Sequence, residues 1–197
     1  TVPGDFSSIA YPIAAALITQ SSVTITHVDM NDSQGDKLLI SALQSMGADI
    51  QYSEENQSLH IKGGQPLTGA KIDMNLFIDA IPILSVIACY ASGTTHLYNA
   101  AIARTKECDR LHAMTVELKK MGANIEEHND SLTITQSTLH GADIESYHDH
   151  RIVMSLAMAT LGASSSSTIH DTACIAKSYP DFIQHMCSLG ITIKETT

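Results

Sequence analysis

Residues 44–50 read QSMGADI, and the same phrase returns as KKMGANI at 119–125 and, more weakly, as CSLGITI at 187–193. The copies are separated by 75 and then 68 residues. Self-similarity at a nearly fixed spacing is typical of a chain assembled from repeated supersecondary units. The sequence therefore predicts three units, at about residues 1–75, 76–146 and 147–197.

Each copy of the phrase follows the same predicted order of elements. An aspartate opens an apolar, Ala-rich helix, and a short alternating strand comes next. The three aspartates, Asp5, Asp79 and Asp149, lie 74 and 70 residues apart, and aspartate is a favoured helix N-cap. The predicted helices span 5–17, 79–91 and 149–161, and the strands span 23–27, 95–99 and 168–171. Because these helices have few polar positions on any face, we expect them to be buried.

The second part of each unit is predicted to be an amphipathic helix that ends at a glycine. Gly47, Gly122 and Gly190 fall where a left-handed C-cap favours that residue. Two strands then form a hairpin, 50–53 with 59–62 and 125–128 with 132–135, whereas the third copy stops without such a pair. The expected fold is a single α/β (α+β) domain over residues 1–197, with the Ala-rich helices inside and the sheets outside.

Composition excludes several classes of function. The chain of 197 residues has 11 Lys and Arg against 21 Asp and Glu, for a formal charge of −10. Diffuse binding to nucleic acid or anionic membrane depends on many cations, so neither is expected as a partner, and a clamp-like ring on DNA is disfavoured. No apolar stretch approaches the roughly 20 residues of a membrane span. Four irregularly spaced cysteines indicate reduced thiols and a cytoplasmic location.

Five of the 11 cations are concentrated in the loops and helix starts of the second and third units: Arg104, Lys106, Arg110, Arg151 and Lys177. Cations beside helix N-termini are the elements of a site for a small anion. Two other interpretations stay open. Asp79 is equally explained as a simple helix cap, and Lys106-Glu107 as a solvated surface pair. His148 and His150 are two residues apart, but no third metal ligand stands out.

Residues 104–114, RTKECDRLHAM, resemble a signature of the 5-enolpyruvylshikimate-3-phosphate (EPSP) synthase family. Three further matches follow the family's order: GDFSS at 4–8, DHR at 149–151 and AKSYPD at 176–181. All fall in the C-terminal half of that family's chain. The resemblance implies one domain of the enolpyruvyl transferase fold, made of three βαβαββ units, without its N-terminal partner domain. The first residues lack an initiator Met and run directly into a helical pattern, which is what the middle of a longer chain or a processed N-terminus would show.

The resemblance also implies an activity. The family transfers the enolpyruvyl group of phosphoenolpyruvate to the 5-hydroxyl of shikimate 3-phosphate and releases phosphate, with no metal or organic cofactor. It serves aromatic amino acid biosynthesis and is the target of glyphosate. We expect a monomer whose partner is the N-terminal half of the same enzyme, and an isolated chain that is inactive.

Site residues are implied by matched position. Asp79, Glu107 and Lys177 would be catalytic. Asp79 and Lys106 would bind shikimate 3-phosphate, and Arg110, Arg151 and Lys177 would bind phosphoenolpyruvate. Protonating a methylene carbon while deprotonating a hydroxyl needs an acid and a base in different environments, and which group moves which proton stays open.

Two positions depart from the family pattern, and two other assignments remain. Ile102 stands where many members have an Asn that touches the shikimate phosphate, and Cys108 replaces the commoner Ser or Thr. A UDP-N-acetylglucosamine enolpyruvyl transferase would share the architecture but lacks the K-E-x-D-R run. A noncatalytic module that binds an anion or a protein on the same scaffold is the alternative from another class.

Overall fold

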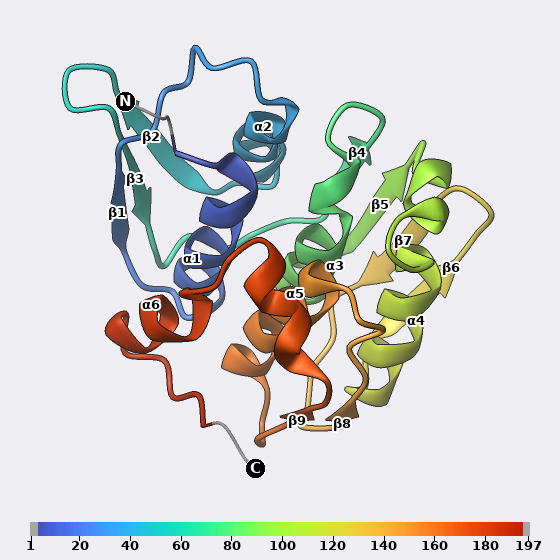
Figure 1. The fold of residues 1–197 in the computed structure, drawn as a ribbon. Coiled ribbons are helices and arrows are strands. Elements are labelled where there is room, and N and C mark those ends of the chain that lie inside the picture. The colour runs from blue at the N-terminus through green and yellow to red at the C-terminus, as the bar shows by residue number, and fades with distance from the viewer. Residues whose placement is uncertain (1–3, 195–197) are drawn as a thin grey trace.

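Three apolar helices form the centre of the molecule in the computed structural model, which describes residues 4–194 (Figure 1). They are α1 (Phe6–Ile18), α3 (Ile81–Tyr90) and α5 (His150–Ala159). In α3 every residue from Ile81 to Cys89 is buried, as expected for a helix without a polar face. The three helices pack against one another, so one core is shared by all parts of the chain. The ends of the predicted domain, residues 1–3 and 195–197, lie outside the described residues.

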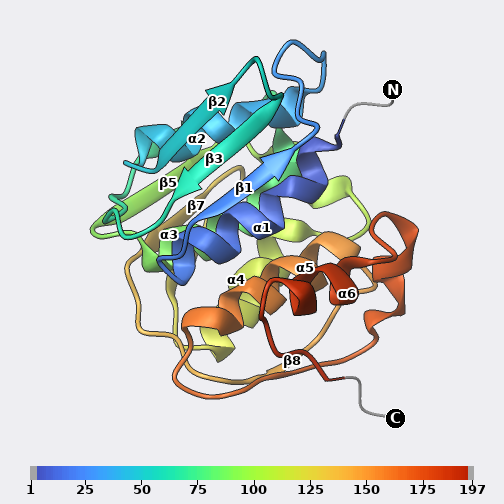
Figure 2. The same cartoon turned by 90° about the vertical axis from the view of Figure 1, so that its left-hand side faces the viewer.

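Small sheets cover the outside of this helical core (Figure 2). The first sheet contains β1 (Val23–Thr26), β2 (Asp49–Ser53) and β3 (Ser58–Lys62) in the antiparallel order β1-β3-β2. The second contains β4 (Lys71–Asp73), β5 (Thr94–Tyr98), β6 (Asn124–Glu127) and β7 (Leu132–Thr135) in the order β4-β5-β7-β6, with β4 parallel to β5. The third pairs β8 (Asp143–Ile144) with β9 (Thr168–Ile169) in parallel. Burial alternates along β7, where Leu132 and Ile134 point inward, so this face of the sheet packs against the core.

The remaining helices follow 3₁₀ turns. The turns η1 (Gly35–Lys37), η3 (Ala101–Thr105) and η5 (Thr172–Lys177) precede the helices α2 (Leu38–Ser45), α4 (Arg110–Lys120) and α6 (Phe182–Ser188). Two more turns, η2 (Ile78–Ala80) and η4 (Thr160–Gly162), flank the central helices. The order helix, strand, 3₁₀ turn, helix therefore occurs three times, and the predicted α/β class is confirmed.

The predicted glycine C-caps are confirmed, whereas the interpretation of Asp79 as a helix cap is wrong. Gly47, Gly122 and Gly190 have φ of 96°, 91° and 91°, in the left-handed region. Asp5 and Asp149 cap α1 and α5, but α3 begins after Ala80 without a side-chain cap. Asp79 instead lies inside η2 and leaves its carboxylate available for other partners.

The extra strands β4 and β8 have three and two residues, which is too short for a periodicity to be visible in sequence. After α6, the described residues contain no strand pair, in agreement with the truncated third copy. None of the helices within residues 4–194 combines the length and apolar character needed to cross a bilayer.

Candidate active site

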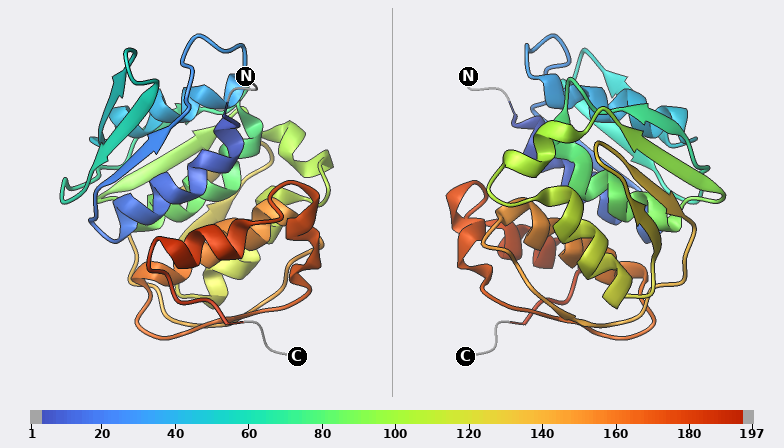
Figure 3. Two further views of the ribbon diagram at one scale, coloured as in Figure 1. Left: turned by 60° about the vertical axis from the view of Figure 1, so that its left-hand side comes forward. Right: turned by 90° about the vertical axis from the view of Figure 1, so that its right-hand side faces the viewer.

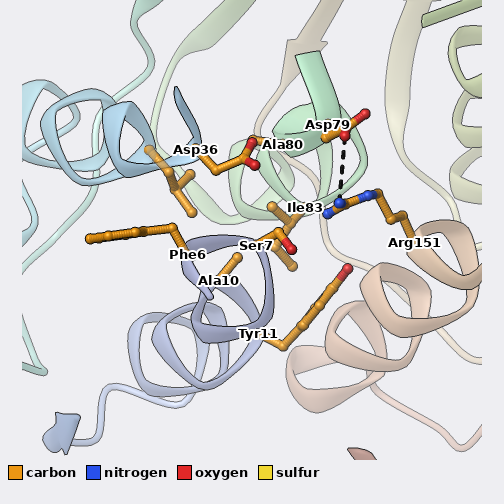
Figure 4. Close-up of a pocket in the computed structure, with 10 residues that line it drawn as sticks. Phe6, Ser7, Ala10, Tyr11, Asp36, Asp79, Ala80, Ile83 and Arg151 are labelled. Atoms are coloured by element: carbon orange, nitrogen blue, oxygen red, sulfur yellow. Dashed lines mark ion pairs between the residues drawn. The ribbon is translucent and has the colours of Figure 1, made fainter. Parts of the chain in front are cut away.

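The starts of the three central helices meet at one end of the molecule, around a small hollow (Figure 4). Its lining comes from α1, from η1 and the start of α2, from η2–α3 and from the first turn of α5: Phe6, Ser7, Ala10, Tyr11, Asp36, Leu39, Asp79, Ala80, Ile83 and Arg151. Backbone N–H groups in the first turn of a helix create a positive potential, and among the described residues the carboxylates of Asp5 and Asp149 each accept from only one of these groups in α1 and α5. Three such ends at one place favour an anionic ligand.

Asp79 is the point at which distant segments converge. Its carboxylate lies 3.2 Å from Lys106 Nζ, 2.7 Å from Arg110 Nη1 and 3.5 Å from Arg151 Nη2. Partial burial acts to raise the pKa of Asp79, but the surrounding guanidinium and ammonium groups outweigh it and hold the pKa below its usual value. The carboxylate is therefore ionised at neutral pH and able to accept hydrogen bonds.

Arg110 is the buried centre of an ionic network. Its side chain is 1% exposed, and its three guanidinium nitrogens all donate to carboxylates. Nη1 reaches Asp79, Nη2 reaches Glu107 at 2.6 Å, and Nε reaches Asp149 at 2.7 Å. Burial alone would lower the pKa of Arg110, but the carboxylates keep it above its ordinary value. Arg110 is thus fixed in place and fully charged.

Asp149 joins this network to helix α5. It is completely buried, and it caps the helix by accepting from Arg151 N at 2.8 Å. Burial raises the pKa of Asp149, and the hydrogen bonds from Arg110 more than offset this, so the net pKa is lowered. Because one carboxylate both pairs with Arg110 and caps α5, the positions of Arg110 and Arg151 are coupled.

The structure brings together five of the six predicted site residues: Asp79, Lys106, Glu107, Arg110 and Arg151. Glu107 keeps 40% of its side chain exposed, so it remains reachable from solvent. Lys177, the sixth, ends η5 as an exposed residue whose ammonium group makes no hydrogen bond or ion pair with any described residue.

Of the two departures from the family pattern, Cys108 contacts this cluster. Ile102 is 59% exposed on η3. The Sγ atom of Cys108 lies 3.7 Å from Asp149, and burial, followed by the Asp149 charge, raises the pKa of Cys108 to about 12. This thiol stays protonated at neutral pH.

Two polar residues of the hollow were not singled out from the sequence. Asp36 lies in η1, the turn of the first unit that corresponds to η3 beside Lys106, so the equivalence of the units was a usable signal. Tyr11 lies in the Ala-rich helix α1, next to Arg151 (Figure 4), and nothing in its sequence surroundings marks it. Burial is the main reason that the pKa of Tyr11 is raised, so its hydroxyl stays neutral.

Replacing Asp36 with Asn is expected to stabilise this chain at pH 7. Burial, assisted by the charges of Asp79 and Asp5, raises the pKa of Asp36 above 3.8, although Arg151 opposes the shift. A raised pKa in the folded state means that folding disfavours the ionised carboxylate. The resulting loss of stability is absent well below pH 3.8, where Asp36 is protonated in both states, and complete above the folded-state pKa. Urea unfolding of both proteins across pH 3–7 tests this. A constant difference, or destabilisation at pH 7, would contradict it.

The fold is that of the enolpyruvyl transferases. NikO, an enolpyruvyl transferase from Streptomyces tendae, superposes on the whole chain with a TM-score of 0.79 at 20% identity, over 45% of its own length, which shows a shared fold. The chain belongs to the EPSP synthase (3-phosphoshikimate 1-carboxyvinyltransferase) family, whose profile matches residues 1–186.

Individual relatives agree with this assignment. The 3-phosphoshikimate 1-carboxyvinyltransferase of Chlamydia felis is 47% identical over 99% of this chain and 44% of its own length, and that of Methanosarcina acetivorans is 44% identical over 99% and 45%. EPSP synthase from Acinetobacter baumannii has a TM-score of 0.91 at 35% identity and covers all of this chain. The chain spans less than half the length of these relatives and matches their C-terminal half.

Proposed function

We propose that this chain is the C-terminal half of a 3-phosphoshikimate 1-carboxyvinyltransferase of the shikimate pathway. The reaction moves the enolpyruvyl group of phosphoenolpyruvate onto the 5-hydroxyl of shikimate 3-phosphate and releases phosphate. The observation that carries the proposal is the convergence of Lys106, Arg110 and Arg151 on one ionised carboxylate, Asp79, where three helix N-termini meet.

The assembly is part of the same proposal. Residues 1–197 form one domain of units at about 1–75, 76–146 and 147–197, which the core shared by α1, α3 and α5 supports. It works in the cytoplasm as a monomer, with the N-terminal half of the enzyme as its only protein partner.

In this proposal, Asp79 and Lys106 bind shikimate 3-phosphate. An ionised carboxylate accepts hydrogen bonds from substrate hydroxyls, and the lowered pKa of Asp79 keeps it in that form. The cationic Lys106, 3.2 Å away, is placed to contact the same substrate. Asp79 and Glu107 are the two carboxylates available for proton transfer, and Glu107 is the more exposed to an incoming ligand.

Arg110, Arg151 and Lys177 bind phosphoenolpyruvate in this proposal. Its carboxylate and phosphate can accept bidentate hydrogen bonds from guanidinium groups and pair with an ammonium group. In this chain, however, Lys106, Arg110 and Arg151 are already balanced by Asp79, Glu107 and Asp149. An anionic substrate therefore needs cations beyond this cluster. Lys177 supplies one, and we propose that the N-terminal half supplies the others, so that the isolated chain does not turn over.

Calorimetric titration tests this proposal. We expect phosphoenolpyruvate and shikimate 3-phosphate to bind the chain weakly when it is alone and at least about tenfold more tightly when an N-terminal half from the family is added, because closure excludes water from the charges. Phosphate release should occur only in the mixture. Steady phosphate release by this chain alone, or no ligand binding even with the partner half, would overturn the proposal.

A further inference from the structure

Helix α4 holds the segment that leads into α5 at two separate points. The first is Arg110, the first residue of α4, which pairs with Asp149. The second is Glu117, seven residues later, which lies on the same face because two helical turns take about seven residues. Figure 3 shows α4 along the outside of the central helices, next to α5. The two attachments are about 10 Å apart along the helix axis.

Glu117 is a completely buried carboxylate whose side-chain hydrogen bonds and ion pair are all made with this segment or its own helix. Oε1 accepts from the Tyr147 hydroxyl at 3.0 Å, and Oε2 accepts from Glu145 N at 3.1 Å. Lys120 Nζ lies 2.9 Å away and balances the charge. A buried carboxylate is tolerated only when it is paired and hydrogen-bonded in this way. Among the described residues, the Glu117 side chain makes no hydrogen bond or ion pair with Asp79, Lys106, Arg110 or Arg151.

The segment held by Glu117 has an unfavourable backbone. Tyr147 and His148 both have φ of 53°, in the left-handed region that bulky side chains rarely adopt. Two local bonds shape the turn, from His148 N to Ser146 Oγ at 3.1 Å and from Asp149 N to Ser146 O at 3.0 Å. A strained turn persists only where its surroundings fix it. The hydrogen bonds of Glu117 to Tyr147 and Glu145 hold the turn from outside, and the Arg110–Asp149 pair holds the residue that follows it.

The turn ends directly at the charged cluster. Asp149 is the next residue, and Arg151, which contacts Asp79, follows in the first turn of α5. We propose that Glu117 is a positioning residue of the site, which holds Tyr147 and the backbone of Glu145 so that the strained turn places Arg151 against Asp79. The substrate part of this inference rests on the proposed function, whereas the geometric part concerns Arg151 and Asp79 alone.

The first test is Tyr147→Phe, which removes only the hydroxyl that donates to Glu117. The charge of Arg151 is one cause of the lowered pKa of Asp79, together with Arg110 and Lys106, and it acts against burial. If the turn loosens and Arg151 moves away, the pKa of Asp79 rises toward its ordinary value. A pH titration of the Asp79 carboxyl carbon by NMR measures this in the chain as it stands, and requires no substrate.

Tyr90→Phe is the matched control. Its hydroxyl also belongs to a half-buried tyrosine and donates to a backbone carbonyl, that of Ala159, at the other end of α5. A merely structural role for the Tyr147 hydroxyl predicts the same response in both variants. We expect the pKa of Asp79 to rise in Tyr147→Phe and to stay unchanged in Tyr90→Phe. An unchanged pKa in Tyr147→Phe, or an equal rise in both, would overturn the inference.

Glu117→Gln provides a second variant, because the neutral amide keeps the size of the side chain but cannot accept both bonds with the same geometry. Binding of phosphoenolpyruvate in the presence of the N-terminal half should weaken about fivefold in Glu117→Gln and Tyr147→Phe, and not in Tyr90→Phe. A rise in the pKa of Asp79 with unchanged ligand affinity would refute the positioning role in binding. Absence of ligand binding by the unmodified protein would instead refute the proposed function, while the Asp79 titration still decides the placement of Arg151.

Discussion

Replacement of Arg110 by Met is expected to lower the free energy of unfolding by about 3–5 kcal/mol, because it breaks a buried ion pair from one side. Asp149 has no exposed surface, and without Arg110 its charge is left in the core. Methionine fills a similar volume, so the loss measures the uncompensated carboxylate more than a cavity. Glu107 and Asp79 are partly exposed and can regain water, which makes Asp149 the main source of the penalty.

Arg104→Met is the control for this experiment. Arg104 also bridges two carboxylates, Asp109 and Glu127, but its side chain is 25% exposed and both partners reach solvent. We expect a loss of about 1 kcal/mol there, as for other exposed ion pairs. Equilibrium unfolding in urea, followed by circular dichroism, gives both values. Equal losses in the two variants would show that Arg110 is not the buried centre of the network.

Lys177→Ala should greatly reduce turnover and leave the free energy of unfolding almost unchanged, in contrast to Arg110→Met. The side chain is exposed and has no partner among residues 4–194, so its removal should change the free energy of unfolding by less than about 0.5 kcal/mol. If Lys177 holds phosphoenolpyruvate in the complete enzyme, kcat/KM should fall at least about 100-fold. Glu107→Gln should behave similarly, because Glu107 is also partly exposed and is assigned to proton transfer.

Lys62→Ala serves as the comparison for charge removal. Lys62 is an exposed lysine on β3, away from the cluster around Asp79, and its loss should leave turnover unchanged. Phosphate release by the complete enzyme measures all three variants. Unchanged turnover in Lys177→Ala and Glu107→Gln would contradict the catalytic roles proposed for these two residues.

The repeated phrase was enough to predict the central helices, and the reason is physical. Helix α3 has no polar face, so burial follows from its composition, and the glycines at 47, 122 and 190 are the residues that a left-handed C-cap requires. The position of Asp79 was less predictable. Its counterparts Asp5 and Asp149 cap their helices, and the alignment left a cap and a site role equally open for Asp79. The structure shows that its carboxylate pairs with three cations from other segments.

Sequence alone therefore determined the class of fold, the family resemblance and the set of charged residues, because these depend on local composition, spacing and residue identity. Only the tertiary structure decided how those charges are used. It buried Arg110 among three carboxylates, left Lys177 in solvent and joined Glu117 to the turn before Arg151. Such differences arise from burial and from contacts between residues about 30 to 70 positions apart, and a local sequence pattern carries no information about either.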